Sequence, residues 1–151
     1  MDVALEPILL AVGPKDSDRA EKLADFAVDI AAPADSTVVL AHVFTEEEYT
    51  SATEQLGIES PTEVTPDEVA RRHSTTRAIS KALDDAGVNH EIRGTIGPHG
   101  DEIIRLAAED DSGLVVVGGR KRSPTGKAVF GSTAQEVMLS APCPVTFVRG
   151  E

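Results

Sequence analysis

The sequence is poor in cysteine and in aromatic residues. Cys143 is the single cysteine, so the chain can form no internal disulfide. This cysteine lies between two prolines beside an apolar run, which favours a packed side chain over a reactive nucleophile. Tryptophan is absent, and aromatic residues make up 3% of the chain, although 40% of the residues are hydrophobic. The composition therefore predicts a globular protein with an aliphatic core.

Positive charge is also scarce. Five lysines and nine arginines oppose 26 acidic residues, which gives a formal net charge of −12. The electrostatic field of this net negative charge repels polyanions, so we expect no binding to nucleic acid or to an anionic membrane. Widely spread acid with little lysine is typical of a cytoplasm at molar salt, where screening removes self-repulsion, and it predicts a halophilic archaeal source. The alternative is an ordinary acidic cytosolic protein.

Long hydrophobic runs and targeting segments are missing too. No apolar stretch approaches the ~18 residues expected of a membrane-spanning helix. Asp2 and Glu6 stand where a signal peptide would carry basic residues. We therefore expect a cytoplasmic protein. The length of 151 residues predicts one domain over residues 1–151.

Five short apolar runs have the composition of strands, and helical patterns separate them. The predicted strands cover residues 7–12, 36–44, 89–97, 114–119 and 143–149. The predicted helices run from Asp16 or Ser17 to Pro33, from a Thr65 cap to about Ala86, over 98–113, and over 132–141 with Ser132 or Thr133 as the cap. In the third of these helices, the residues predicted to face inward are Ile103, Ile104, Ala107 and Ala108. Residues 45–64 have no clear period and predict a loop or a short helical excursion.

The regular alternation of strands and helices predicts an α/β fold with three α/β/α layers. Right-handed crossovers then give a parallel sheet with helices on both faces. Ligands of such sheets bind beyond the carboxyl ends of the strands, where the winding reverses. Gly13 and Gly118 lie at the carboxyl ends of the two most buried predicted strands. If these strands are neighbours, both glycines face one crevice.

A cation-rich segment lies between two glycine sites. No Asp or Glu occurs from Ser112 to Gln135, although acids are common elsewhere. Gly118-Gly119 and Gly131-Ser132-Thr133 can form turns in which backbone N–H groups hold phosphate, with Gly131 expected at positive φ. The cations between them are Arg120, Lys121, Arg122 and Lys127. The segment predicts an anion site, and the alternative is a solvated loop.

Other nucleotide and catalytic motifs are excluded or weak. Ala128 stands where a P-loop requires a Mg²⁺-binding Ser or Thr, and a dinucleotide fingerprint would follow the first strand. The four histidines show no metal-ligand spacing. We expect His42 to pack beside the pocket or to line it, and His99 to lie on the surface. No base with a metal or oxyanion partner can be identified, so catalysis is the less favoured alternative.

The glycine spacing then gives the chain a family resemblance. Gly118, Lys121 and Gly131-Ser132 stand at the spacing Gly-x2-Gly-x9-Gly-(Ser/Thr), which is a motif of the universal stress protein family. Three longer stretches also resemble this family: ILLAVGPKDSDRAEKLADFA, GPHGDEIIRLAAEDDSGLVVVGGRK and APCPVTFVR. The resemblance covers essentially the whole chain apart from Thr45–Val64.

The resemblance implies a fold, a ligand and an assembly. It implies an adenine nucleotide alpha hydrolase-like fold whose sheet has the order 3-2-1-4-5. It implies an ATP or AMP site, with Mg²⁺ accompanying ATP alone, and a homodimer through residues 144–149. The implied nucleotide-binding residues are Ala11, Val12, Gly13, Val43, Val117, Gly118, Arg120, Lys121, Arg122, Gly131, Ser132 and Thr133.

Two departures from the family pattern keep other functions open. Gly13 stands where ATP-binding members usually carry Asp, and Lys121 replaces the second motif glycine. The favoured function is a nucleotide-binding stress-response or regulatory module. The alternatives are an interaction protein of the same fold that binds no nucleotide and acts through its dimer surface, and a slow ATPase.

Overall fold

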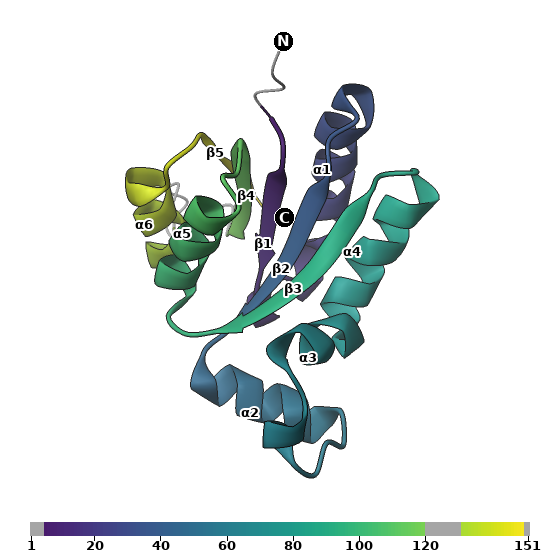
Figure 1. Ribbon diagram of the computed structural model, residues 1–151, viewed down its shortest axis with the longest axis vertical. Coiled ribbons are helices and arrows are strands. Elements are labelled where there is room, and N and C mark those ends of the chain that lie inside the picture. Colours follow the sequence, from purple (N-terminus) through teal and green to yellow (C-terminus); the bar gives the residue numbers. More distant parts are fainter. Residues whose placement is uncertain (1–4, 120–130, 150–151) are drawn as a thin grey trace, which may run out of the picture.

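The computed structural model describes residues 5–119 and 131–149. Within them, five parallel strands form one sheet in the order β3-β2-β1-β4-β5, as predicted (Figure 1). The strands are β1 (Ile8–Val12), β2 (Val38–Phe44), β3 (His90–Ile96), β4 (Leu114–Gly119) and β5 (Val145–Arg149). β1, β2 and the first part of β4 are buried along their length, because helices cover both faces of the sheet.

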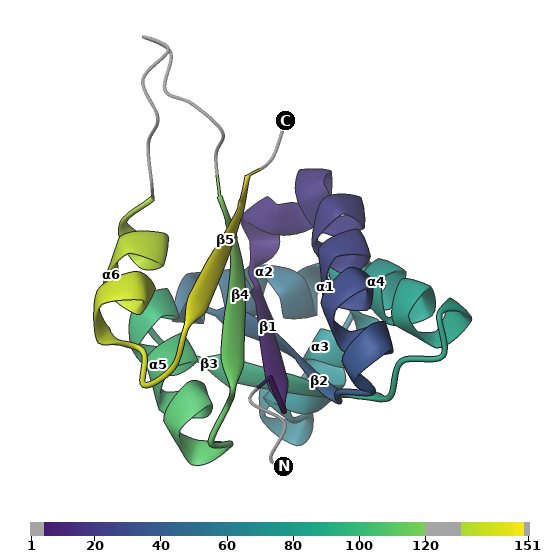
Figure 2. The same ribbon diagram turned by 90° about the horizontal axis from the view of Figure 1, so that it is seen from above.

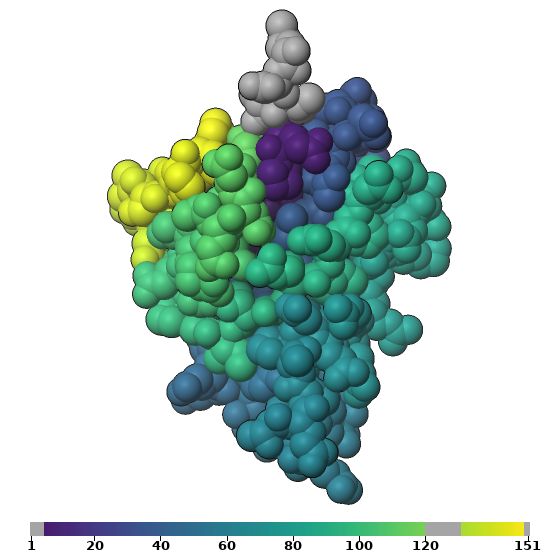
Figure 3. All heavy atoms as spheres, viewed as in Figure 1, coloured from purple at the N-terminus to yellow at the C-terminus, as the bar shows by residue number. Residues whose placement is uncertain are grey.

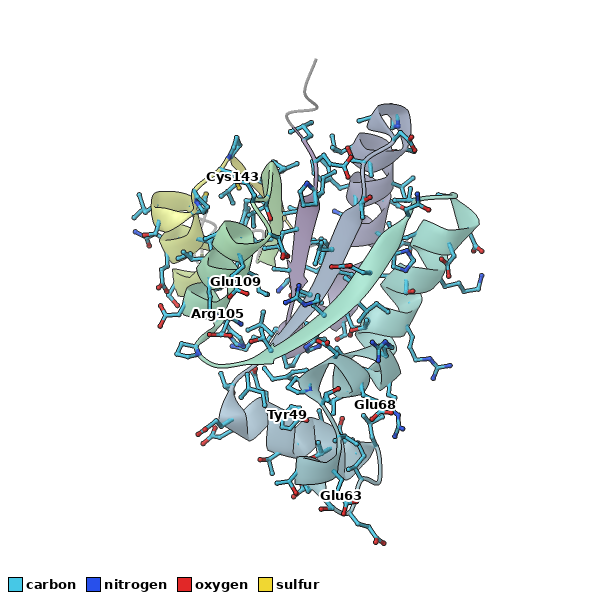
Figure 4. All side chains as sticks on the ribbon, viewed as in Figure 1. Tyr49, Glu63, Glu68, Arg105, Glu109 and Cys143 are labelled. Atoms are coloured by element: carbon cyan, nitrogen blue, oxygen red, sulfur yellow. The ribbon has the colours of Figure 1, made fainter. Side chains whose placement is uncertain are left out.

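The core has two halves, one on each face of the sheet. Leu10 of β1 faces α1 (Ala20–Ala34) and α4 (Ser74–Asp85), whereas Leu9 faces α5 (His99–Glu109) and α6 (Ser132–Ser140). This alternation follows from the two-residue period of a strand. Figure 2 shows the resulting three layers edge-on. Cys143 packs against the α5–α6 half, as predicted, and lies beside the start of β5 (Figure 4).

The first crossover differs in detail from the prediction. A 3-10 helix, η1 (Pro14–Arg19), precedes α1, and the helix continues one residue beyond Pro33. The chain leaves α1 at Asp35, whose φ of 53° is left-handed. Ser36 N–H donates to the Ala31 carbonyl at 3.0 Å, and the Asp35 N–H donates to the same carbonyl, so the turn satisfies acceptors of the last helical turn. The turn after Pro33, rather than the proline itself, therefore ends the helix.

The segment between β2 and β3 holds more helix than the sequence predicted. Residues 45–64 contain α2 (Glu46–Gln55) and a 3-10 turn, η2 (Pro61–Glu63). Thr45 and Glu48 cap α2 reciprocally: each side chain accepts a hydrogen bond from the other residue's backbone N–H. With α3 (Pro66–Arg72), α2 projects beyond the carboxyl ends of the strands (Figure 1), and this part of the chain forms the lower end of the surface in Figure 3.

The single helix predicted from Thr65 to Ala86 is two helices. His73 is extended, with φ −70° and ψ 137°, and it separates α3 from α4. Its Nδ1 accepts a hydrogen bond from Thr75 N–H at 3.3 Å and so caps α4. Thr65 does cap α3, and Gly87 follows α4 in the left-handed conformation, as the sequence indicated.

Two smaller predictions were wrong: the inward-facing residues of α5 and the N-cap of α6. Leu106 and Ala107 of α5 are buried beside Ile103, whereas Ala108 is exposed and Ile104 is half-buried. Gly131, rather than a hydroxyl residue, is the N-cap of α6. Within the described residues, no helix is long and apolar enough to cross a membrane.

The two edges of the sheet differ in how they are covered. The start of α3 lies against β3, where Asp67 Oδ1 accepts a hydrogen bond from Gly94 N–H at 2.7 Å. This contact satisfies an outward-facing donor of an edge strand. The outer edge of β5 pairs with no strand among residues 5–119 and 131–149.

Candidate functional site

The candidate site lies where the winding of the sheet reverses. β1 and β4 are neighbours, with Ala11 in register with Val117. From β1 the chain turns toward α1 on one face, and α6, the helix after β4, covers the opposite face (Figure 2). The loops at these two strand ends therefore diverge, and parallel sheets bind their ligands at such a point.

The structure brings most of the predicted site residues to this edge of the sheet. Arg120, Lys121 and Arg122 lie outside the described residues. Ser132 is exposed and Thr133 half-buried at the start of α6. Four other predicted residues are 1–4% exposed, so their side chains belong to the core and a ligand could meet little more than their backbone: Ala11, Val12, Val43 and Val117.

Gly13 directly follows β1 in a position that is neither strained nor too close for a side chain. Its φ is −141°, so the residue does not need a left-handed conformation. Its N–H donates to Asp16 Oδ2 at 2.8 Å. A Cβ at this position would lie 3.6 Å from the Val43 carbonyl oxygen and 3.9 Å from His99 Nε2, which are ordinary contact distances.

An ion pair on η1 lies directly against Gly118 of β4. Arg19 Nε donates to Asp16 Oδ1 at 2.5 Å, and the two side chains are 15% and 12% exposed. A Cβ at Gly118 would be 2.9 Å from Arg19 Nε and 3.1 Å from Asp16 Oδ1. The bare face of this motif glycine is therefore covered by the pair. Neither residue was predicted to belong to the site, although the sequence has an acid and a cation three residues apart after the first strand.

A second pair joins the starts of α2 and α5. His99 Nε2 lies 2.6 Å from Glu48 Oε1, which also accepts the Thr45 N–H. The His99 side chain is 28% exposed, so it lies at the surface, as predicted, but paired with Glu48. Its position near Gly13 makes it part of the rim of the site.

Gly131 does not have the positive φ that was predicted for it. Its φ is −62° and its ψ is 158°, an extended conformation that side-chain-bearing residues adopt readily. A Cβ there would meet no described atom within 4 Å. Gly131 has no side chain, so the cap residue cannot satisfy the first N–H groups of α6. Those groups point out of the start of α6.

His42 packs in the interior and does not supply a charge. Its side chain is fully buried, and its pKa is lowered to about 3 by burial and by the nearby His73 and His99. A neutral imidazole contributes no cation to the crevice. No group of three His, Cys, Asp or Glu side chains suited to a metal was found in the part of the chain that the structure describes.

A separate hollow of about 620 Å³ lies on the outer side of α4, away from Gly13 and Gly118. Its lining mixes cations and acids with Ile92 of β3, and it includes Arg71, Arg77, Lys81, Asp84 and Asp85. The acids oppose the cations, so this hollow is a poorer anion site than the divergent loops of β1 and β4.

The comparisons with known proteins agree with this architecture. The model of the universal stress protein family matches residues 5–149. A universal stress protein from Mycolicibacterium smegmatis is 37% identical over 79 residues, which are 52% of this chain and 61% of that protein. The match thus spans less than two thirds of that relative.

Solved structures match over nearly the whole chain. A universal stress protein from Archaeoglobus fulgidus is 30% identical with a TM-score of 0.69, covering 95% of this chain and 98% of that one. A universal stress protein from the same organism in complex with dAMP is 24% identical with a TM-score of 0.61, covering 97% and 100%. The second likeness shows the shared fold.

Proposed function

Because the chain belongs to the universal stress protein family, we propose that it is an adenine-nucleotide-binding module of a stress response. The nucleotide would lie across the carboxyl ends of β1 and β4, with AMP or ATP as the ligand and Mg²⁺ accompanying ATP alone. The bound dAMP of one solved relative supports an adenine ligand of this class.

The observation that carries this proposal is the pair of divergent loops. Gly13 follows β1 and Gly118 lies next to the end of the neighbouring parallel strand β4, and both glycines are half-buried while the strands beneath them are buried. The start of α6 adds backbone N–H groups that no side chain of the described residues caps, together with the hydroxyls of Ser132 and Thr133. Helix N-termini and glycine-bounded turns favour phosphate.

The proposed role is binding without efficient turnover. Hydrolysis needs a positioned base with a metal or oxyanion partner. His42, with its lowered pKa and buried ring, is not placed to act as such a base on a ligand at the crevice. A slow ATPase is therefore a less favoured function than a regulatory binding module.

An interaction protein that binds no nucleotide is the second candidate. The open outer edge of β5 favours it, since an unpaired edge strand can add a strand from another chain. We propose a homodimer through residues 144–149 in either case. The acidic composition supports a cytoplasmic protein of a halophilic archaeon.

Native mass spectrometry of the purified protein tests the proposed ligand. We expect a carried-over adenine nucleotide, or an adduct of one nucleotide per subunit after addition of AMP. Denaturing mass spectrometry of the same sample identifies the released base. A protein that stays free of adduct at millimolar AMP while folded would favour the interaction protein instead.

A further inference from the structure

We propose that Arg19 is a phosphate ligand of this site and that Asp16 positions it. This inference deepens the proposed function, on which it rests, by naming the group that distinguishes a nucleotide from its uncharged nucleoside. The ligand chemistry is a phosphate group attached to adenosine.

Asp16 fixes Arg19 through one edge of the guanidinium. Its Oδ1 accepts the Arg19 Nε–H at 2.5 Å, while its Oδ2 accepts the Gly13 N–H at 2.8 Å. The carboxylate is thus held by the end of β1 and in turn holds the arginine. Two fixed contacts on a side chain that is 12% exposed leave it little freedom.

The rest of the guanidinium is available to a ligand. In the described part of the chain, Nη1 and Nη2 of Arg19 donate to no protein acceptor. An arginine bonded through Nε alone still presents several N–H donors in a planar fork, which suits a phosphate. With 15% of its side chain exposed, Arg19 is mostly buried against the end of β4 and only partly open to solvent.

Gly118 makes room for this arrangement. A Cβ there would lie 2.9 Å from Arg19 Nε and 3.0 Å from its Cδ, so any larger residue would push the arginine away. The Arg19 guanidinium therefore lies over the end of β4, on the η1 side of the divergent loops. A phosphate bound beyond the carboxyl ends of β1 and β4, on the η1 side, would meet Arg19.

Local charge explains why such a residue is needed. The chain carries a formal net charge of −12, which repels an anionic ligand. Because Asp16 balances the charge of Arg19, the arginine acts on the ligand through the N–H donors that it holds at short range, which salt screens little. Lys15 of the same 3-10 helix is exposed and adds a second positive charge.

The test compares AMP with adenosine in the parent and in Arg19→Gln. We expect the parent to bind AMP at least about tenfold more tightly than adenosine, as a charge-assisted contact provides. Arg19→Gln should bring the two affinities close together by weakening AMP alone. Asp16→Asn, which keeps an acceptor for the Gly13 N–H, should reduce the preference in part. Loss of fold would instead weaken both ligands equally.

Two further variants serve as controls for the role of Arg19. Arg19→Lys keeps the charge without the planar fork and should restore part of the preference. Arg77→Gln makes the same change of charge on the exposed side of α4 and should leave the preference unchanged. If Arg19→Gln prefers AMP as strongly as the parent does, the inference is wrong while nucleotide binding stands.

Pyrophosphate separates this inference from the proposed function. Suppose that pyrophosphate stabilises the parent but not Arg19→Gln, and that neither adenosine nor AMP binds. This result would support the anion site and contradict the adenine ligand. A parent that responds to none of the three probes would overturn both proposals.

Discussion

The imidazole of His42 stacks on the ring of Phe44, with the ring centroids 4.1 Å apart and the planes inclined by 21°. His73 lies on the same cluster, 4.4 Å from His42 between centroids. Neither ring nitrogen of His42 has a hydrogen-bond partner among the described residues. A buried ring without partners is stable when neutral, which is why its pKa falls to about 3.

Acid should therefore unfold the protein through His42. The folded pKa of about 3 lies below the ordinary 6.5, so the unfolded chain binds the proton more tightly. Stability is complete above pH 6.5 and is lost as the pH falls toward 3, by on the order of 3 kcal/mol at pH 4. The lowered pKa of His73 acts in the same direction.

Denaturant unfolding at pH 7, 5 and 4 measures this loss. His42→Leu, which replaces the ring by an apolar side chain, should flatten the profile. His90→Gln leaves His42 in place and should keep the parent's acid sensitivity. A His42→Leu profile as steep as that of the parent would assign the acid loss to other groups.

Gly94→Ala should be strongly destabilising. A Cβ at Gly94 would lie 2.0 Å from the Pro66 carbonyl oxygen and 2.4 Å from its carbon, so α3 would have to move off β3. We expect a loss of about 3 kcal/mol in the free energy of unfolding. Gly87→Ala is the matched control, because its position has φ +71° and open space, and it should cost about 1 kcal/mol. Equal losses in the two variants would contradict the close approach of α3.

The sequence predicted those features of the fold that depend on local patterns. Continuous apolar runs located the buried strands, and Gly87 located a helix end. The break at His73 was not predictable from periodicity, because α3 and α4 have compatible helical spacing and the break depends on packing against β3. α2 was missed, although the Thr45 and Glu48 capping signal was present in the sequence.

The site was predicted in its place but not in its chemistry. The glycine motif identified Gly118, yet the residue that covers its bare face, Arg19, comes from a segment far away in the sequence. A contact of that kind depends on strand register, which a single sequence does not specify. For the same reason, the Glu48–His99 pair could not be expected from either segment alone.

The β5 edge predicts a homodimer. Because the Val115 N–H donates to the Pro144 carbonyl, Val145 directs its own N–H toward the open edge. Light scattering should give about twice the chain mass of 15.9 kDa. Val145→Pro should yield a folded monomer, since it removes an outward donor and spares the β4 ladder. A dimer that survives this change would place the interface on another surface.

Stability should rise from low salt to molar KCl. Asp25 and Asp29 are exposed one turn apart on α1, and such like charges repel until salt screens them. The double variant with Asn at both positions should melt at a higher temperature than the parent at low salt, with the difference vanishing at molar KCl. A parent melting temperature that is flat or falls with KCl would remove the halophile proposal.

Titration calorimetry with AMP at molar KCl tests nucleotide binding most directly. We expect saturable heat for one AMP per chain, little heat for GMP, and none for Gly131→Val. The extended backbone of Gly131 accepts valine at a cost of about 1 kcal/mol in helix capping, so that variant should stay folded while its side chain blocks the phosphate. The absence of heat from the folded parent at millimolar AMP, or unchanged binding by Gly131→Val, would contradict the proposed site.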